Sequence, residues 1–177
     1  MRLLLSDKEL NINFLESDEN KYIDLSKLRI SNCIGCFGCW TKTPGKCVIR
    51  DDAVKVYPII AKSDKVIYVS KVKYGSYDTV MKTMLERAIP IQQAFIRLQQ
   101  AFIRLLNGEA HHVQRDVAMK DAIIIAYGNI EDEEKEIFKR LVERNSHNMN
   151  FKSFNVIFVD EENLEEVVAK EVRKWEK

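Results

Sequence analysis

The chain has 177 residues, 46% of them hydrophobic and 31% charged, which is the size and composition of one domain with its own core. Its 28 Lys and Arg against 27 Asp and Glu leave a formal net charge of +1, which excludes an overall field for holding nucleic acid or an anionic membrane. No apolar stretch reaches the roughly 20 residues that span a bilayer, and the start MRLLLSDKEL is charged too early for a secretory signal. We therefore expect a cytoplasmic protein with a single domain at 1–177.

The first elements along the chain are two short candidate strands, Arg2–Leu5 and Lys21–Leu25. About 15 residues separate them, which is close to the minimum for a helical crossover between parallel strands. Within that gap Leu10, Ile12 and Phe14 alternate with polar residues, a pattern typical of a strand. We expect an extended segment here in place of the usual first helix.

All four cysteines follow in one loop, SNCIGCFGCWTKTPGKCVIRDD at 31–52, with the spacing C-x2-C-x2-C-x7-C. This clustering argues against a disulfide framework and favours metal or redox chemistry. Four thiolates can hold a [4Fe-4S] cluster or a tetrahedral zinc, and the candidate ligands are Cys33, Cys36, Cys39 and Cys47. In the alternative without a metal, Cys36 and Cys39 are small buried residues, and glycines and Pro44 shape the loop. The sequence leaves these alternatives open.

Asp51 and Asp52 precede an apolar helical pattern, so we interpret them as an N-cap and first turn rather than as paired catalytic acids. Three nearly continuous β-branched and aromatic runs, 66–69, 122–126 and 154–159, predict central strands covered on both faces, as in a parallel sheet. Helical stripes lie between and after them, at 80–88, 137–142 and 164–175. Because strands and helices alternate, we expect an α/β fold with a doubly wound sheet.

One heptapeptide is duplicated, since residues 92–98 and 99–105 both read QQAFIRL. Seven residues are almost two helical turns, so a longer helix could absorb the second copy with its apolar face nearly in register. We interpret the duplication as structurally tolerated. His111 and His112 are adjacent, so their side chains point in different directions and cannot jointly hold a metal without further ligands.

Three segments together resemble the NADPH-dependent FMN reductase and iron–sulfur flavoprotein branch of the flavodoxin-like superfamily. They are CIGCFGCWTKTPGKCVIRDDA at 33–53, VIYVSKVKYGSYDTVMKTMLERAIP at 66–90 and LNGEAHHVQR at 106–115. The resemblance implies a three-layer sandwich with a mostly parallel five-stranded sheet and FMN at the carboxyl ends of the strands. It further implies NAD(P)H as co-substrate, a small-molecule electron acceptor and a homodimer.

The resemblance also implies which residues contact the flavin. In such proteins the turn after the third strand wraps the flavin ring, and the turn after the fourth forms the other wall. The matching positions here are Lys71, Val72, Tyr74, Gly75 and Ser76 in the first turn, and Tyr127 and Gly128 in the second. Gly75 lacks a Cβ and would let the backbone approach a ring.

Two departures from the family pattern bear on flavin binding. Where members carry a pattern like SPVYWGS, this chain has SKVKYGS, with Lys71 in place of the Pro and Lys73 in place of the first aromatic residue. Members also have a Gly/Ser-rich loop after the first strand, which leads into a helix and holds the FMN phosphate on backbone N–H groups. Here that segment is SDKELNINFLESDEN, which has no glycine and presents carboxylates. We expect weakened FMN binding.

Two functional hypotheses follow. The first is an FMN-dependent NAD(P)H oxidoreductase in which the flavin supplies the chemistry, and no side chain is predicted as an acid or base. The second is a degenerate member that has lost its flavin and acts as a structural or interaction partner. The SDKELNINFLESDEN segment favours the second hypothesis, whereas the Tyr74-Gly75-Ser76 turn and the cysteine loop favour the first.

Overall fold

The computed structural model describes residues 1–43, 45–92, 103–106, 109–112 and 117–176. Among these residues, parallel strands form a central sheet in the order β2-β1-β3-β7-β8, and a two-residue strand, β4, pairs antiparallel with β3. The bounds are β1 (Arg2–Ser6), β2 (Asn20–Asp24), β3 (Lys65–Lys73), β4 (Ser76–Tyr77), β7 (Lys120–Tyr127) and β8 (Phe151–Val159). This is the strand order of flavodoxin-like folds, whose switch point lies between β1 and β3. The expected fold class is confirmed.

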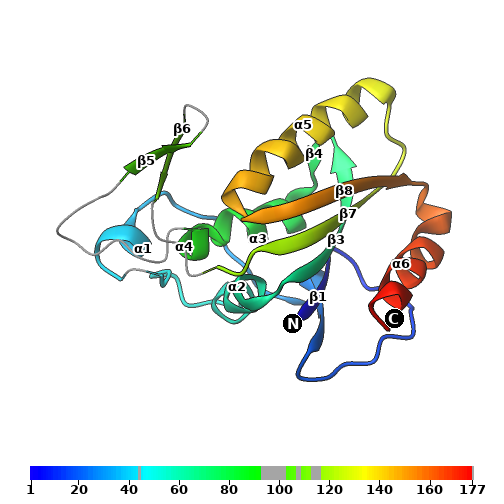
Figure 1. Cartoon of the computed structure of the whole chain (residues 1–177), viewed down its shortest axis with the longest axis horizontal. Helices are drawn as coiled ribbons and strands as arrows, with labels where there is room; N and C mark the ends of the chain where they lie inside the picture. The colour runs from blue at the N-terminus through cyan, green and yellow to red at the C-terminus, as the bar shows by residue number, and fades with distance from the viewer. Residues whose placement is uncertain (44, 93–102, 107–108, 113–116, 177) are drawn as a thin grey trace.

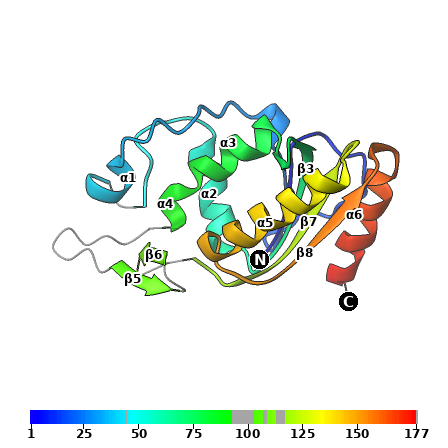
Figure 2. The same ribbon diagram turned by 90° about the horizontal axis from the view of Figure 1, so that it is seen from above.

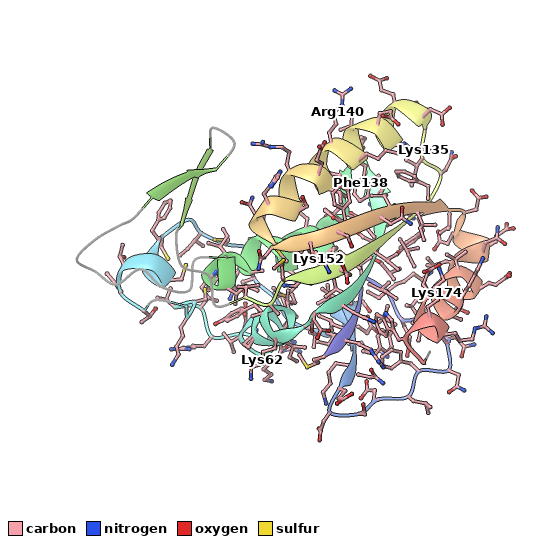
Figure 3. All side chains as sticks on the ribbon, viewed as in Figure 1. Lys62, Lys135, Phe138, Arg140, Lys152 and Lys174 are labelled. Atoms are coloured by element: carbon pink, nitrogen blue, oxygen red, sulfur yellow. The ribbon has the colours of Figure 1, made fainter. Side chains whose placement is uncertain are left out.

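Helices cover both faces of the sheet (Figures 1 and 2). One face packs against α2 (Ala53–Lys62), α3 (Thr79–Arg87) and α5 (Asp132–Asn148), and the other against α6 (Leu164–Arg173). Phe138 of α5, labelled in Figure 3, is fully buried and makes edge-on ring contacts with aromatic residues of β4 and β8. The two faces have separate cores because successive strand residues point to opposite sides of the sheet.

The connection from β1 to β2 contains no helix, as expected, and is extended. Leu10 is 5% exposed, and it packs with Ile12 and Phe14 into the core beside α6. The Phe14 ring lies 6.0 Å from that of Tyr22 and 6.4 Å from that of Trp175. This alternating apolar segment therefore covers the face of the sheet that a first helix would otherwise cover.

β8 differs from the expected central strand. It pairs with β7 and lies at the edge of the sheet among the described residues, and residues 152–155 on it are exposed. The exposed set includes Phe154 and Lys152, the latter labelled in Figure 3. The prediction was wrong because aromatic and β-branched composition indicates a strand without specifying how many neighbours it has.

Most of the QQAFIRL duplication lies outside the described residues. The first copy begins at the end of α4 (Ile89–Gln92), and the second ends in β5 (Ile103–Leu106), which pairs antiparallel with β6 (Glu109–His112). A single helix through both copies is therefore wrong at its far end, because residues 103–105 are paired in a hairpin. No helix in the described part of the chain is long and apolar enough to cross a membrane. The remaining short elements are α1 (Gly38–Thr41), η1 (Leu25–Lys27), η2 (Glu161–Asn163) and η3 (Lys174–Glu176).

Candidate functional site

The cysteine loop, residues 31–52, precedes α2 and lies with α1 at the end of the molecule opposite the carboxyl end of β8 (Figures 1 and 2). Its backbone turns sharply at Gly35 and Phe37, whose φ angles are 63° and 53°. One cavity of about 180 Å³, here called the cysteine cavity, is lined by all four candidate ligands, Cys33, Cys36, Cys39 and Cys47. The fold thus brings the four predicted thiols around one space.

The four thiols differ in exposure. Cys33 and Cys36 are exposed, Cys39 is half-buried and Cys47 is buried. The alternative in which Cys36 is a small core residue is wrong, because this part of the loop lies on the surface. Among the four cysteines, only Cys47 is placed as a packed core residue. Its side chain is buried, and its backbone N–H donates to the hydroxyl of Tyr57 in α2.

Burial disfavours a bare thiolate at Cys39. Burial raises the pKa of the Cys39 thiol to about 11, and repulsion from a thiolate at Cys47 acts in the same direction. Cys39 is therefore protonated at neutral pH when no metal is bound. A metal centre would supply the missing positive charge and release protons as it binds.

The described residues form no ready-made site for a single metal ion. A zinc ion needs four ligand atoms at about 2.0–2.3 Å from one point. Among the described residues, no group of three His, Cys, Asp or Glu side chains is close enough to hold one ion. A [4Fe-4S] cluster instead takes its four thiolates on different irons around a larger core. The four thiols line one cavity, and the described residues contain no preformed site for a single ion.

A second cavity, of about 810 Å³, lies at the carboxyl ends of β3, β7 and β8 and is called the strand-end cavity. Of the predicted flavin contacts, Lys71, Val72, Tyr74 and Gly128 line it. Acidic residues that follow β8 or begin α5 complete its wall: Glu134, Asp160, Glu161 and Glu162. The cavity is large enough for a cofactor, but carboxylates dominate its charge.

Three predicted flavin contacts do not line that cavity. Gly75 has φ +67°, and a Cβ built on it would lie 2.5 Å from Cγ2 of Ile137, so its missing side chain makes room for α5. Ser76 lines a different groove, between α3 and α5. Tyr127 is buried, and its hydroxyl donates to Oδ1 of Asp7 at 2.9 Å. The positive φ and the packing of α5 therefore account for this glycine without a flavin ring.

The segment after β1 does not fit an FMN phosphate. Four of the backbone N–H groups that follow β1 already have acceptors: that of Asp7 donates to the Val69 carbonyl at 3.1 Å, and that of Lys8 to Ser6 Oγ at 3.3 Å. Further along, the N–H of Leu10 donates to Tyr22 Oη at 2.9 Å, and that of Asn11 to Glu165 Oε1 at 2.8 Å. No helix begins in this segment. A phosphate would therefore find these four donors occupied and no helix dipole here.

The two lysines of the SKVKYGS turn are also engaged. Lys71 Nζ lies 3.7 Å from Glu161, and Lys73 Nζ lies 3.1 Å from Asp78. Lys8 pairs with the same Glu161 at 2.9 Å. The cations that could have met a phosphate are thus balanced by nearby carboxylates.

Sequence reasoning missed the role of one buried ion pair. Asp52 is the residue before α2, as expected, but its side chain makes no capping hydrogen bond. Asp51 instead accepts from the Ala53 N–H at 3.1 Å and binds Arg87 of α3. Burial opposes the charge of Arg87, but its hydrogen bond with Asp51 and its attraction to Cys47 raise the pKa of the guanidinium. The sequence carried no clear signal for this pair, because nothing local to Arg87 shows that its side chain is buried against a carboxylate 36 positions away.

No protein-family model matches the chain. Its curated relatives include an iron–sulfur flavoprotein of Methanocaldococcus jannaschii, 32% identical over 92 residues, which are 52% of this chain and 47% of the relative. Another is an iron–sulfur flavoprotein of Archaeoglobus fulgidus, 35% identical over 83 residues, which are 47% of this chain and 36% of the relative. The matched region thus spans less than half the length of these relatives.

Solved structures share the fold at low sequence identity. The NAD(P)H:quinone oxidoreductase of Methanothermobacter marburgensis has a TM-score of 0.58 at 11% identity, covering 98% of this chain and 92% of the other. The FMN-dependent NADH-azoreductase of Bacillus anthracis, in complex with FMN, has a TM-score of 0.53 at 9% identity, covering 98% and 96%. The chain has the flavodoxin-like fold, and its relatives belong to the branch that the cysteine loop resembles.

Proposed function

We propose that this chain is a flavodoxin-like oxidoreductase that transfers electrons through a [4Fe-4S] cluster bound by Cys33, Cys36, Cys39 and Cys47. The observation that carries the proposal is the convergence of these four thiols on the cysteine cavity. The similarity to proteins named iron–sulfur flavoproteins supports it. A reducing compartment such as the cytoplasm would keep the thiols free to bind iron.

The chain's own residues would hold and shield the cluster. The four thiolates would bind the irons, and the apolar side chains of Ile34, Val48 and Ile89, which line the same cavity, would cover part of the cluster. When bound, a cluster supplies electron transfer at a potential set by its charge and surroundings. Because Cys33 and Cys36 are exposed, one edge of the site is within reach of a small-molecule acceptor.

Anaerobic reconstitution with iron and sulfide is expected to give about four irons per chain and a broad absorbance shoulder near roughly 400 nm. Replacing Cys36 or Cys47 by alanine should abolish the shoulder, because each removes one ligand from the cavity. Thr41→Ser, in the same loop but away from the cavity, is the matched control and should behave as wild type. Equal iron retention by the alanine variants and wild type would rule out the cysteine site.

For the strand-end cavity we propose flavin binding of low affinity, with NAD(P)H as the electron source. The size of the cavity and the presence of Lys71, Val72, Tyr74 and Gly128 in its wall support a ring site there. The occupied donors after β1 favour a second candidate function, in which the chain has lost its flavin and acts as an interaction partner. Both candidates are compatible with the cysteine site, because the two cavities have no lining residue in common.

Riboflavin and FMN are expected to bind with the same affinity, because the donors of Asp7, Lys8, Leu10 and Asn11 after β1 are already bonded and no helix begins there. We expect both dissociation constants to lie above 1 µM, which corresponds to about −8.2 kcal/mol. Titration of flavin fluorescence measures both constants on the same protein. Tenfold tighter binding of FMN than of riboflavin would show that the phosphate is held, and undetectable binding of either would support the second candidate.

A further inference from the structure

Arg87 is the last residue of α3, and its side chain is 1% exposed. It forms a bidentate pair with Asp51, with Nη1 2.6 Å from Oδ2 and Nη2 2.9 Å from Oδ1. The pair joins positions 36 residues apart in the sequence. A planar guanidinium matched to a carboxylate in this way fixes direction as well as distance.

The same guanidinium is bonded to both ends of the cysteine loop. At the start of the loop, Nη1 donates to the Ser31 carbonyl at 2.7 Å, and at the end Nη2 donates to the Ile49 carbonyl at 3.4 Å. Asp51 adds a second link by accepting from the Ser31 N–H at 2.8 Å. Ser31 lies two positions before Cys33, and Ile49 lies two positions after Cys47. Arg87 therefore closes the base of the loop that carries all four thiols.

One turn earlier on α3, Thr83 donates from Oγ1 to Oδ1 of Asn32 at 3.1 Å. This is an uncharged contact to the same end of the loop. It supplies a matched comparison for Arg87, because losing it removes a contact between α3 and the loop without changing any charge.

Arg87 also presents charge to the cysteine cavity. It lines that cavity together with Cys47, and its Nε–H has no hydrogen-bonding partner among the described residues. A cluster bound by four thiolates carries net negative charge, and its potential responds to neighbouring charges and hydrogen bonds. A cation beside the cluster favours the reduced form, because reduction adds negative charge.

We propose that Arg87 is the positioning residue of the cysteine site: it closes the loop through Ser31, Ile49 and Asp51, and its charge beside Cys47 raises the reduction potential of the cluster. The statement about potential rests on the proposed cluster, whereas the statement about loop closure holds for the protein without metal. Asp51 shares the closing role but has the opposite charge. Substitutions at the two residues should therefore have the same effect on closure and opposite effects on potential.

The test compares wild type with four variants, Arg87→Gln, Arg87→Lys, Asp51→Asn and Thr83→Val. In reconstituted protein, we expect Arg87→Gln and Asp51→Asn to shorten the lifetime of the cluster under a chelator on the order of tenfold. Arg87→Gln should lower the reduction potential and Asp51→Asn should raise it. Arg87→Lys should shorten the lifetime while keeping the potential, and Thr83→Val should change both little.

Loop closure is measured separately on apoprotein in which Cys33, Cys36 and Cys39 are serine, so that Cys47 alone reacts with a thiol reagent. Arg87→Gln and Arg87→Lys should each speed this reaction, and Thr83→Val should do so far less. If wild type takes up no cluster, the proposed function fails while the reaction of Cys47 still tests closure. An unchanged Cys47 rate in both Arg87 variants, or potentials that move the same way in Arg87→Gln and Asp51→Asn, would overturn the proposal. Should Arg87→Gln fail to fold by circular dichroism, Arg87→Lys tests closure through the Cys47 rate and Asp51→Asn tests the potential.

Discussion

Changing Asp51 to alanine is expected to lower the free energy of unfolding of the apoprotein by about 3–5 kcal/mol, because it leaves the buried charge of Arg87 without its partner. The substitution also removes the acceptor for the N–H groups of Ser31 and Ala53. Urea unfolding followed by circular dichroism measures the change. Asp132→Ala is the control, since the Asp132 carboxylate is 97% exposed and pairs with Lys135 at the surface. A loss at Asp51 no larger than that of the control would mean that the ion pair adds nothing to the fold.

The contribution of Asp51 to the free energy of unfolding should also depend on pH. Burial opposes its charge, but the hydrogen bonds from Arg87 and the Ser31 N–H outweigh burial and hold the pKa of the carboxyl below its ordinary 3.8. Because the folded-state pKa lies below the unfolded one, the stabilisation is complete above about pH 4 and is lost as pH falls through the folded value. The difference in stability between wild type and Asp51→Asn should therefore narrow in acid and be constant near neutral pH.

The sequence was sufficient for the elements whose pattern is local. The alternation of Leu10, Ile12 and Phe14 predicted an extended segment in place of a helix, and these side chains cover the sheet beside α6. The spacing of the cysteines allowed a common metal centre as one alternative, and the turns at Gly35 and Phe37 bring the four thiols around one cavity. Both depend on residues close together in the chain, where spacing limits the geometry.

What the sequence could not supply depends on contacts between distant segments. The role of Arg87 requires α3 to pack beside the cysteine loop, and no local pattern reports that. Gly75 was assigned to a flavin ring, yet α5 occupies the space that its side chain would need. The edge position of β8 follows from strand order, which composition does not encode. In each case the residue type was informative, but its partner could be identified only from the fold.

Asp7 is another residue whose partners could be identified only from the fold. Its contacts occupy donors beside the switch point between β1 and β3. The sequence indicated only that carboxylates would repel a phosphate after β1. In the structure this carboxylate is 8% exposed and lies at the carboxyl ends of β1, β3 and β7. It accepts from Ser70 Oγ at 3.1 Å, from the Lys71 N–H at 2.7 Å and from the Tyr127 hydroxyl at 2.9 Å. An internal anion thus takes the donors that the strand ends would otherwise offer to a ligand.

Replacing Asp7 by alanine is expected to lower the free energy of unfolding by about 3 kcal/mol, because three buried or half-buried donors lose their acceptor. Asp7→Asn should cost much less, since its amide oxygen can still accept from Ser70 and Lys71. Burial raises the pKa of Asp7 despite these hydrogen bonds. Wild type therefore gives up stability as pH rises from the unfolded-state pKa of 3.8 through the higher folded value, and the uncharged Asn variant does not. Urea unfolding at several pH values should show Asp7→Asn gaining on wild type between acid and neutral pH, with Asp7→Ala below both. If the Asn variant were instead as unstable as the Ala variant at neutral pH, the three donors would need a negatively charged acceptor. The carboxyl ends of the strands would then form an anion-binding site that the carboxylate of Asp7 occupies.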